Sequence, residues 1–259
     1  MSRKLRVAVH KFSSCDGCQL AFLNLGAALL EVAQLADFVH FPEAGPVDAD
    51  APADVAFVEG SISTPADVER IQRVRNSCKQ LITIGACATS GGIQALRNLA
   101  DARQWVAGVY ASPEYISALA GVSPVARHVK VDFELWGCPV SSHQIVAALR
   151  ALLFGVTPLD EQAKVCMECK RRQIVCVMVA QGKPCMGPVT RTGCGALCPA
   201  FGRACYACYG PAENPNTDAL AHRFAGLGLL PEEIAHRYAF INNGAPAFRD
   251  AARKVRDER

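Results

Sequence analysis

Thirteen cysteines in 259 residues are the feature that most constrains this chain, because so many thiols must be cross-linked, bound to metal or buried. Eight of them fall between Cys166 and Cys208, among glycines, prolines and arginines. The chain is too long for a small disulfide-stapled protein, and residues 5–10 form a strand-like segment with no apolar targeting segment before it. We therefore expect reduced, metal-binding thiols, with at least one cysteine outside any scheme of pairs or fours.

Charge and hydrophobicity exclude several classes of protein. The formal net charge is +3, which gives no reason to expect a nucleic-acid partner. Hydrophobic residues make up 51% of the chain, enough for a sizeable core. No run reaches the roughly 18 consecutive apolar residues of a membrane span, and Arg171-Arg172 is internal and so is not an export signal. We expect a cytoplasmic protein without a membrane span.

Residues 1–155 alternate strand-like and helix-like segments, which predicts an α/β domain with a parallel sheet and helices on both faces. Short β-branched or aromatic runs mark the expected strands at residues 5–10, 37–41, 54–59, 80–85 and 128–136. This rhythm is lost from about residue 156 onward, so we predict a second, irregular domain over residues 156–259.

Three helices are expected between and after these strands. Residues 22–35 are apolar nearly all round, so that helix should be buried or lie at an interface. Thr64 followed by Pro65 predicts the start of a second helix, with Thr64 as its N-cap. Ser141 or Ser142 can cap a third helix, which places His143 in its first turn.

The cysteine-rich segment, residues 166–208, contains one apolar run, at residues 175–180. We expect that such a segment cannot build a hydrophobic core from its own side chains and needs metal clusters as cross-links. The last residues, 248–259, are charged and helical in pattern, and we expect them to fray.

Four cysteines follow three of the expected strands. Cys15 and Cys18 come after the first strand, Cys87 after the fourth and Cys138 after the fifth. Loops at the carboxyl ends of parallel strands converge at one edge of a sheet, and four thiolates at one point suit a [4Fe–4S] cluster or a zinc ion. The alternative is that Cys87 and Cys138 are small buried hydrophobic residues, but three thiol-bearing loops arriving together argue against it.

The eight later cysteines divide into two fours, each compact enough for one cluster, although interleaved ligation between them stays open. Two zinc ribbons are the alternative that the spacing allows. The fours are Cys166, Cys169, Cys176 and Cys185, followed by Cys194, Cys198, Cys205 and Cys208. Cys78 is left over at the end of the helix that begins at Pro65, opposite the ligand loops, and we expect it to be a buried structural thiol.

Several motifs, in order, resemble the small subunits of [NiFe]-hydrogenases, and the resemblance runs from residue 5 to about residue 215. The N-terminal motifs are Cys15-x2-Cys18, Val58-Glu59-Gly60-Ser61-Ile62, Gly85-Ala86-Cys87-Ala88-Thr89-x-Gly91-Gly92 and Gly137-Cys138-Pro139. The C-terminal motifs are Cys185-x-Gly187-Pro188, Cys194 and Cys205-x2-Cys208.

The resemblance implies a flavodoxin-like doubly wound sheet, a C-terminal iron–sulfur domain and three [4Fe–4S] clusters for electron transfer. Hydrogen would be split at a nickel–iron site in a separate large subunit, which leaves no catalytic residue in this chain. The implied ligands are Cys15, Cys18, Cys87 and Cys138 (proximal cluster), Cys194, Cys198, Cys205 and Cys208 (medial cluster), and Cys166, Cys169, Cys176 and Cys185 (distal cluster).

Two departures from many periplasmic and membrane-bound relatives are informative. Cys166 stands where many of them have a histidine, and the medial group has four cysteines where many have three. We therefore expect three [4Fe–4S] clusters in a cytoplasmic enzyme, coupled to NAD(P) through flavin- and iron–sulfur-containing diaphorase subunits. Coupling to heterodisulfide reductase and the sulfhydrogenase type stay open.

Two other kinds of protein fit this sequence less well. A subunit of the respiratory NADH dehydrogenase carries one cluster and adjacent cysteines, and this chain has neither feature. A flavodoxin-like FMN protein needs a phosphate loop where Cys15 and Cys18 stand.

Three further features have two interpretations each. Glu59 ends a strand near the ligand loops, where it either relays protons or supports a loop by accepting hydrogen bonds from its N–H groups. Asp16 is a turn former or a tuner of cluster charge. The basic residues 170–172 dock an acidic partner or form a solvated turn, and we prefer the turn. The six histidines have no ligand spacing, and we treat them as structural.

Overall fold

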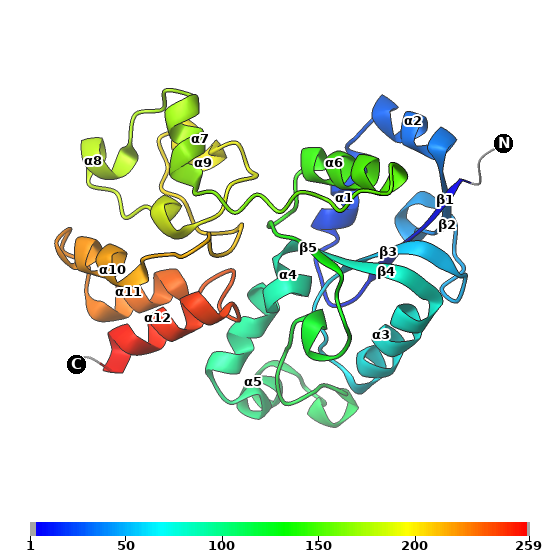
Figure 1. Ribbon diagram of the computed structural model, residues 1–259. Coiled ribbons are helices and arrows are strands. Elements are labelled where there is room, and N and C mark those ends of the chain that lie inside the picture. Colours follow the sequence, from blue (N-terminus) through cyan, green and yellow to red (C-terminus); the bar gives the residue numbers. More distant parts are fainter. Residues whose placement is uncertain (1–3, 258–259) are drawn as a thin grey trace.

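Five parallel strands run through the N-terminal half of the chain in a computed structural model that describes residues 4–257 (Figure 1). They lie in the order β2-β1-β3-β4-β5, which is the flavodoxin-like order that the resemblance implies. The strands are β1 (Leu5–Lys11), β2 (Ala36–His40), β3 (Ala53–Glu59), β4 (Cys78–Ile84) and β5 (Phe133–Leu135). The predicted parallel α/β sheet is confirmed.

Apolar side chains cover both faces of the sheet, because a parallel sheet with helices on each side is buried on both faces. In β1, Val7 and Val9 face one core and Ala8 faces the other. The register continues this pattern across the sheet, with Val9 opposite Phe57 and Phe57 opposite Ile82. Neighbouring strands therefore present the same face to the same core.

The fifth strand is shorter than its sequence predicts. The prediction spans residues 128–136, but the strand contains only Phe133–Leu135. Just before it, the Asp132 carboxylate accepts a hydrogen bond from the Leu81 N–H (2.8 Å) and pairs with Arg75 (2.8 Å). The Asp132 N–H also donates to the carbonyl of Leu81 (2.9 Å), so pairing with β4 begins at Asp132 rather than at residue 128.

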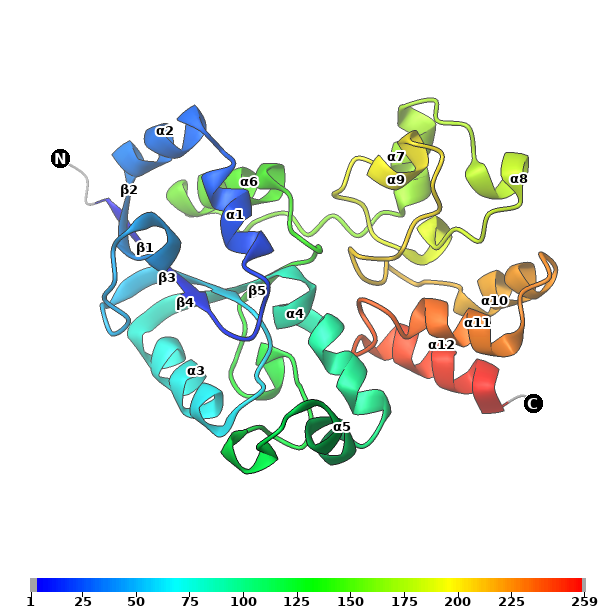
Figure 2. The ribbon, with the colours of Figure 1, turned by 180° about the vertical axis from the view of Figure 1, so that it is seen from behind.

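Helices cover both faces of the sheet, as the alternating pattern predicts (Figure 1 and Figure 2). One core contains residues of α1 and α6, and the core on the opposite face contains residues of α3 and α4. The helices of this half are α1 (Gly17–Leu23), α2 (Ala27–Leu35), α3 (Pro65–Ser77), α4 (Gly85–Ser90), α5 (Ala102–Val109) and α6 (Ser142–Leu153), with 3-10 helices η1 (Pro42–Ala44), η2 (Ile93–Leu99), η3 (Pro113–Tyr115) and η4 (Val125–Arg127).

Both predicted N-caps are present. At the start of α3, Thr64 accepts from the Asp67 N–H (3.1 Å), and the Asp67 carboxylate accepts from the Thr64 N–H (3.0 Å). Ser141 and Gln144 form the same reciprocal pair at the start of α6, at 3.2 and 2.9 Å, which places His143 in its first turn as predicted. Each capping box fixes the residue at which its helix begins.

The apolar segment at residues 22–35 does not form the single helix that its sequence predicts. α1 and α2 meet at an angle of 86°, and Gly26 in the break has a φ of 57°, a conformation that favours glycine. α2 contains no buried residue, and Leu30 and Leu35 are 69% and 58% exposed. Burial within this chain is therefore the wrong prediction for α2, whose apolar surface is uncovered, and the alternative, a position at an interface, stays a prediction.

Within residues 4–257, no single helix is long and apolar enough to span a membrane. The α1–α2 pair reaches that length and composition only when its two bent helices are counted together.

The C-terminal half builds a hydrophobic core, although the cysteine-rich segment, residues 166–208, contributes only part of it. The core joins residues among the cysteines, such as Val165 and Val189, to Phe224, Tyr238 and Phe248 further on. Much of its apolar surface comes from the amphipathic helices that follow the last cysteine, so the composition of the cysteine-rich segment alone does not predict this core. The helices are α7 (Val165–Arg171), α8 (Val177–Gln181), α9 (Leu197–Ala200), α10 (Thr217–Ala225), α11 (Pro231–Tyr238) and α12 (Pro246–Asp257), with the 3-10 helix η5 (Gly187–Val189).

The last helix corrects a second prediction. The sequence predicts fraying over residues 248–259, but α12 is regular as far as Asp257. Phe248, Ala251 and Ala252 are buried in the same core as residues of α10 and α11, beside which α12 lies (Figure 1). A narrow apolar stripe is enough to hold a helix whose other faces are charged. Residues 258 and 259 lie outside the described part of the chain.

Two histidines that are far apart in the sequence stack in the sheet. The ring centroids of His10 in β1 and His40 in β2 lie 4.5 Å apart, and both side chains are buried. Burial, with smaller effects of His40 and Arg70, lowers the pKa of His10 to about 3. Burial and Arg70 also lower the pKa of His40. Both rings are therefore neutral in the folded chain at neutral pH.

We expect the free energy of unfolding to fall as the pH falls below the pKa of an unfolded histidine, about 6.5. Folded His10 takes up a proton only near pH 3, so the unfolded chain binds more protons between these values. At pH 5 this difference at His10 lowers the free energy of unfolding by about 2 kcal/mol relative to pH 8. Thermal midpoints at the two pH values test this. His10→Gln should narrow the gap between them, and an unchanged gap would contradict the assignment.

Candidate metal centres

The first four predicted ligands come together at the carboxyl edge of the sheet. Cys15 lies in the loop after β1, Cys18 in the first turn of α1, Cys87 in α4 directly after β4, and Cys138 between β5 and α6. Burial raises the pKa of Cys87 to about 12, with Cys138 and Cys15 among the neighbours that add to the shift. Burial also raises the pKa of Cys18, followed by the effects of Glu59, Cys87 and Cys138. The three loops therefore place four thiols within electrostatic reach of one another.

Two glycines allow these thiols to approach the backbone closely. A Cβ at Gly92 would lie 2.6 Å from the Sγ of Cys87, and a Cβ at Gly85 would clash with the Sγ of Cys18. Both glycines also have a positive φ, 61° and 85°, which other residues rarely adopt. The glycines let the thiols lie directly against the backbone, and the thiol donors fit an iron–sulfur cluster.

Glu59 supports the loop that carries the first two thiols. It ends β3 and is 2% exposed, and its two carboxylate oxygens accept from the N–H groups of Cys18 (3.0 Å) and Gln19 (3.2 Å). Burial raises the pKa of this carboxyl group, although the two backbone hydrogen bonds favour its charged form. The geometry is that of the loop-supporting interpretation, and the proton relay stays a prediction.

The first of the later fours is also assembled. Burial raises the pKa of Cys166 to about 11, and the next largest contributions come from Cys185, Cys169 and Cys176. A Cβ at Gly187 would lie 3.5 Å from the Sγ of Cys185 and 3.6 Å from that of Cys166, so a glycine again leaves room between two thiols. The four predicted distal ligands are therefore neighbours.

The second four lies between the other two groups. Burial raises the pKa of Cys208 to about 12, followed by the effects of Cys194, of Cys138 from the first group, and of Cys198. On the other side, the Cys205 N–H donates to the Sγ of Cys185, at 3.2 Å. The three groups thus form a row, with the Cys194–Cys208 group in the middle. Because the two later groups are in direct contact, the assignment of each cysteine to one cluster or the other stays a prediction.

A carboxylate that the sequence interpretation missed holds the middle group in place. Glu168, on α7 between two predicted distal ligands, accepts from the N–H groups of Gly193 (2.9 Å), Gly195 (3.2 Å) and Ala196 (2.9 Å). Its carboxylate also lies 3.8 Å from the Sγ of Cys194. A charged residue inside a cysteine motif is the one sequence signal that could have pointed to this role.

The remaining cysteine findings agree with reduced thiols. All thirteen cysteines are free, and Cys78 is buried at the amino end of β4, opposite the ligand loops, as predicted. Among residues 4–257, no group of three or more His, Cys, Asp or Glu residues is arranged to hold a single metal ion.

The structure also bears on Asp16 and on the basic residues 170–172, each of which has two interpretations. Asp16 has a φ of 66° in the turn before α1, where its carboxylate pairs with Lys11 at 2.6 Å. The turn-forming interpretation of Asp16 therefore holds. In the basic run, Lys170 and Arg171 lie in the last turn of α7 rather than in the expected turn. Arg171 is 61% exposed and 3.6 Å from the exposed Glu161, whereas Arg172 donates to the carbonyl of Gly195. The effect of Asp16 on cluster charge and the docking of an acidic partner stay predictions.

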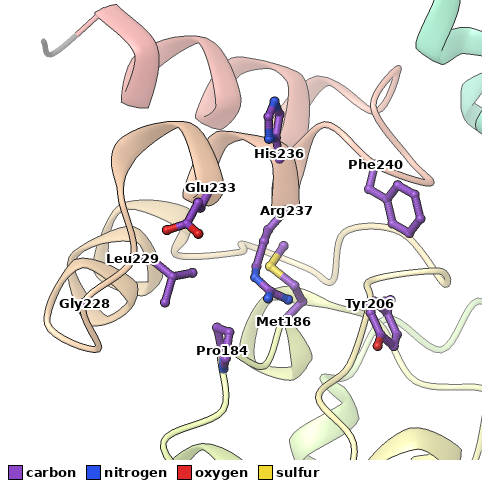
Figure 3. Close-up of a pocket in the computed structure, with 9 residues that line it drawn as sticks. All are labelled: Pro184, Met186, Tyr206, Gly228, Leu229, Glu233, His236, Arg237 and Phe240. Carbon is purple, nitrogen blue, oxygen red and sulfur yellow. The ribbon is translucent and has the colours of Figure 1, made fainter.

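A cavity of about 530 Å³ lies beside the later cysteines, between α11 and the segments around Cys185 and Cys205 (Figure 3). Arg237 from α11 points toward Met186, and Tyr206 lies to one side (Figure 3). Of the nine residues drawn around it, none is a predicted ligand. The cavity shows that α11 faces the cysteine-bearing segments without contributing a ligand to them.

Comparison with known proteins gives matches over most of the chain. Residues 15–152 match the family described as NADH ubiquinone oxidoreductase, 20 Kd subunit. The chain is 32% identical to the delta subunit of sulfhydrogenase 2 of Pyrococcus furiosus, over 90% of this chain and 97% of that one. It is 30% identical to a subunit of the F420-non-reducing hydrogenase vhu of Methanococcus voltae, over 93% and 95%. A chain of a solved NAD⁺-reducing [NiFe]-hydrogenase in the H2-reduced state is 27% identical and has a TM-score of 0.57, over 61% of this chain and 96% of that one.

The full-length relatives share the hydrogenase assignment that the cysteine motifs indicate. The chain belongs to the family of [NiFe]-hydrogenase small subunits. Such subunits bind iron–sulfur clusters and pair with a large subunit that contains the active site.

We expect the two loop-holding carboxylates to be needed for cluster retention. Glu59→Ala and Glu168→Ala each leave main-chain N–H groups without an acceptor, and a hydrogen bond to a charged group contributes about 1.5–3 kcal/mol. Iron per chain and the thermal midpoint should both fall, whereas Glu59→Gln, which keeps one acceptor oxygen, should be milder. Glu161→Ala, at an exposed position, is the control. Normal iron content in both alanine variants would show that the loops hold their shape unaided.

Proposed function

We propose that this chain relays electrons between a nickel–iron site in its large subunit and an acceptor module, through three [4Fe–4S] clusters. A domain spanning residues 1–155 would hold the proximal cluster, and a domain spanning residues 156–259 would hold the medial and distal clusters. The proposed ligands are Cys15, Cys18, Cys87 and Cys138 for the proximal cluster, Cys194, Cys198, Cys205 and Cys208 for the medial cluster, and Cys166, Cys169, Cys176 and Cys185 for the distal cluster.

The row of thiol groups is the observation that carries this proposal. Cys138 of the first group is close enough to Cys208 of the middle group to raise its pKa. The Cys205 N–H of the middle group donates to the Sγ of Cys185 in the last group. Bound clusters would supply one-electron redox chemistry at three points along this row. The chain itself would contribute thiol ligands, an N–H group directed at sulfur, and glycines that let the thiols lie against the backbone.

For the acceptor, we propose an NAD(P)-linked diaphorase module with flavin and iron–sulfur subunits, in the cytoplasm. The similarity to the NAD⁺-reducing hydrogenase supports it. A sulfhydrogenase, or a hydrogenase coupled to heterodisulfide reductase, is the second candidate. The match to the sulfhydrogenase subunit favours that candidate, because it covers 90% of this chain, whereas the NAD⁺-reducing match covers 61%. Rates of hydrogen-dependent reduction of NAD⁺, NADP⁺, polysulfide and heterodisulfide by the purified complex would separate these acceptors.

The cluster proposal predicts about twelve irons and twelve acid-labile sulfides per chain, since twelve thiols form three groups of four. Anaerobically purified protein should be brown, and iron and sulfide analysis would count the clusters. Cys87→Ala should lower the iron content and abolish hydrogen-dependent dye reduction by the complex. Cys78→Ala is the matched control, because Cys78 lies at the opposite end of β4 and should leave both near wild type. Stoichiometric zinc with little iron would refute the proposal.

The uncovered apolar surface of α2 predicts where the large subunit binds. We propose that the large subunit covers α2, the helix that follows α1 in the chain. Leu30→Glu places a charge at a position that is 69% exposed, and we expect it to reduce co-purification of the large subunit without unfolding this chain. Leu25→Glu should instead destabilise the fold, since Leu25 packs against the core. Leu159→Glu, 87% exposed elsewhere, is the control, and equal recovery of the large subunit with Leu30→Glu would place the interface elsewhere.

A further inference from the structure

Four arginines line a cavity that has no assigned role. The cavity has a volume of about 280 Å³ and lies between α12 and the N-terminal half of the chain. Arg249, Arg253 and Arg256 come from α12, and Arg127 comes from η4, more than a hundred residues earlier in the chain. Among the described residues, Asp257 is the only acidic one in its lining.

Basic side chains from two distant segments of the chain line the same cavity. Arg249, Arg253 and Arg256 are spaced by four and three residues, which places them on one face of α12. Arg127 and Arg253 are exposed, and they line the same partly open cavity as Arg249 and Arg256. Like charges gathered around a partly enclosed space repel one another, so a bound anion would be favoured there.

The acidic groups nearby only partly offset this charge. Arg249 pairs with the exposed Asp250 (3.3 Å) and Arg256 with Glu232 (3.5 Å). Within residues 4–257, neither Arg127 nor Arg253 forms a salt bridge. The walls of the cavity therefore retain unpaired guanidinium groups from both halves of the chain.

We propose that this cavity binds a small phosphate-bearing anion. Guanidinium groups match phosphate oxygens with paired hydrogen bonds, and four of them around one space exceed what a single carboxylate needs. The volume lies just below the roughly 300–1,000 Å³ of sites for drug-sized ligands, which suits a phosphate or diphosphate group with any attached group left outside.

Such an anion would join the C-terminal helix to the part of the chain that carries Cys87. Ser90, in the cavity wall, ends α4, and its Oγ donates to the Asn242 side chain at 2.7 Å. Nearby, the Asn243 amide donates to the carbonyl of Gly92 at 3.2 Å. Occupancy of the cavity would therefore stabilise the seam beside the first thiol group.

The test uses the anaerobically purified hydrogenase complex that contains this chain. Inorganic phosphate, pyrophosphate and ADP are titrated by calorimetry, with sodium chloride at matched ionic strength as the control for screening. We expect saturable binding of pyrophosphate that Arg127→Gln and Arg253→Gln each weaken about tenfold or more, since each removes a charge-assisted hydrogen bond. Arg150→Gln, exposed on α6 outside the cavity, should bind as the wild type does. ADP binding as tight as pyrophosphate would identify a nucleotide as the source of the phosphate group.

A second measurement separates a binding role from a structural one. Without added anion, Arg127→Gln and Arg253→Gln should leave the thermal midpoint unchanged or raise it, because each relieves repulsion. Pyrophosphate should raise the wild-type midpoint and have a smaller effect on both variants. Equal binding by wild type and variants, or a response that sodium chloride reproduces, would overturn the proposal. So would loss of another subunit from the variants without any phosphate binding, because the arginines would then belong to a protein interface.

Discussion

The hydrogen bonds that the N–H groups of Cys18 and Gln19 donate to the Glu59 carboxylate are the interaction on which the first thiol group depends. Those N–H groups begin a short helix and have no partner within it, so an acceptor must come from elsewhere in the fold. A carboxylate at the end of β3 supplies it and ties the ligand loop to a central strand. Glu168 does the same for the loop that carries Cys194. Each loop is positioned by its backbone, so its thiol is placed before any metal binds.

The sheet decides which cysteines can meet. Loops after β1, β4 and β5 all leave its carboxyl edge, and each carries at least one of the first four thiols. Cys78 is part of β4 as well, but it opens the strand, six residues before Ile84 at the other end. At about 3.3 Å per residue, this separation keeps it some 20 Å from the ligand edge. Strand direction alone therefore separates a proposed ligand from a thiol that we expect to be structural.

The sequence predicts the parts of this structure that depend on local pattern. The strands, the Thr64 and Ser141 caps and the grouping of thiols follow from periodicity, capping residues and spacing. Local sequence patterns do not predict contacts between segments that are distant in the chain. Glu168 bonds to residues 25 to 28 positions later, which no local pattern signals. The break at Gly26 depends on how α1 packs against the core, and the C-terminal core depends on helices that follow the last cysteine.

Contact between the later thiol groups has a consequence for how such a chain can vary. The Cys205 N–H donates to the Sγ of Cys185, so the backbone beside one proposed ligand shapes the charge on another in the neighbouring group. N–H groups directed at sulfur stabilise negative charge there, which is one of the ways a protein adjusts a cluster's reduction potential. The Thr190 hydroxyl lies 3.8 Å from the Sγ of Cys205 and donates to the carbonyl of Met186 at 2.7 Å, so it braces the same junction. A substitution at this junction would affect both thiol groups together, because the backbone of one group is hydrogen-bonded to a sulfur of the other.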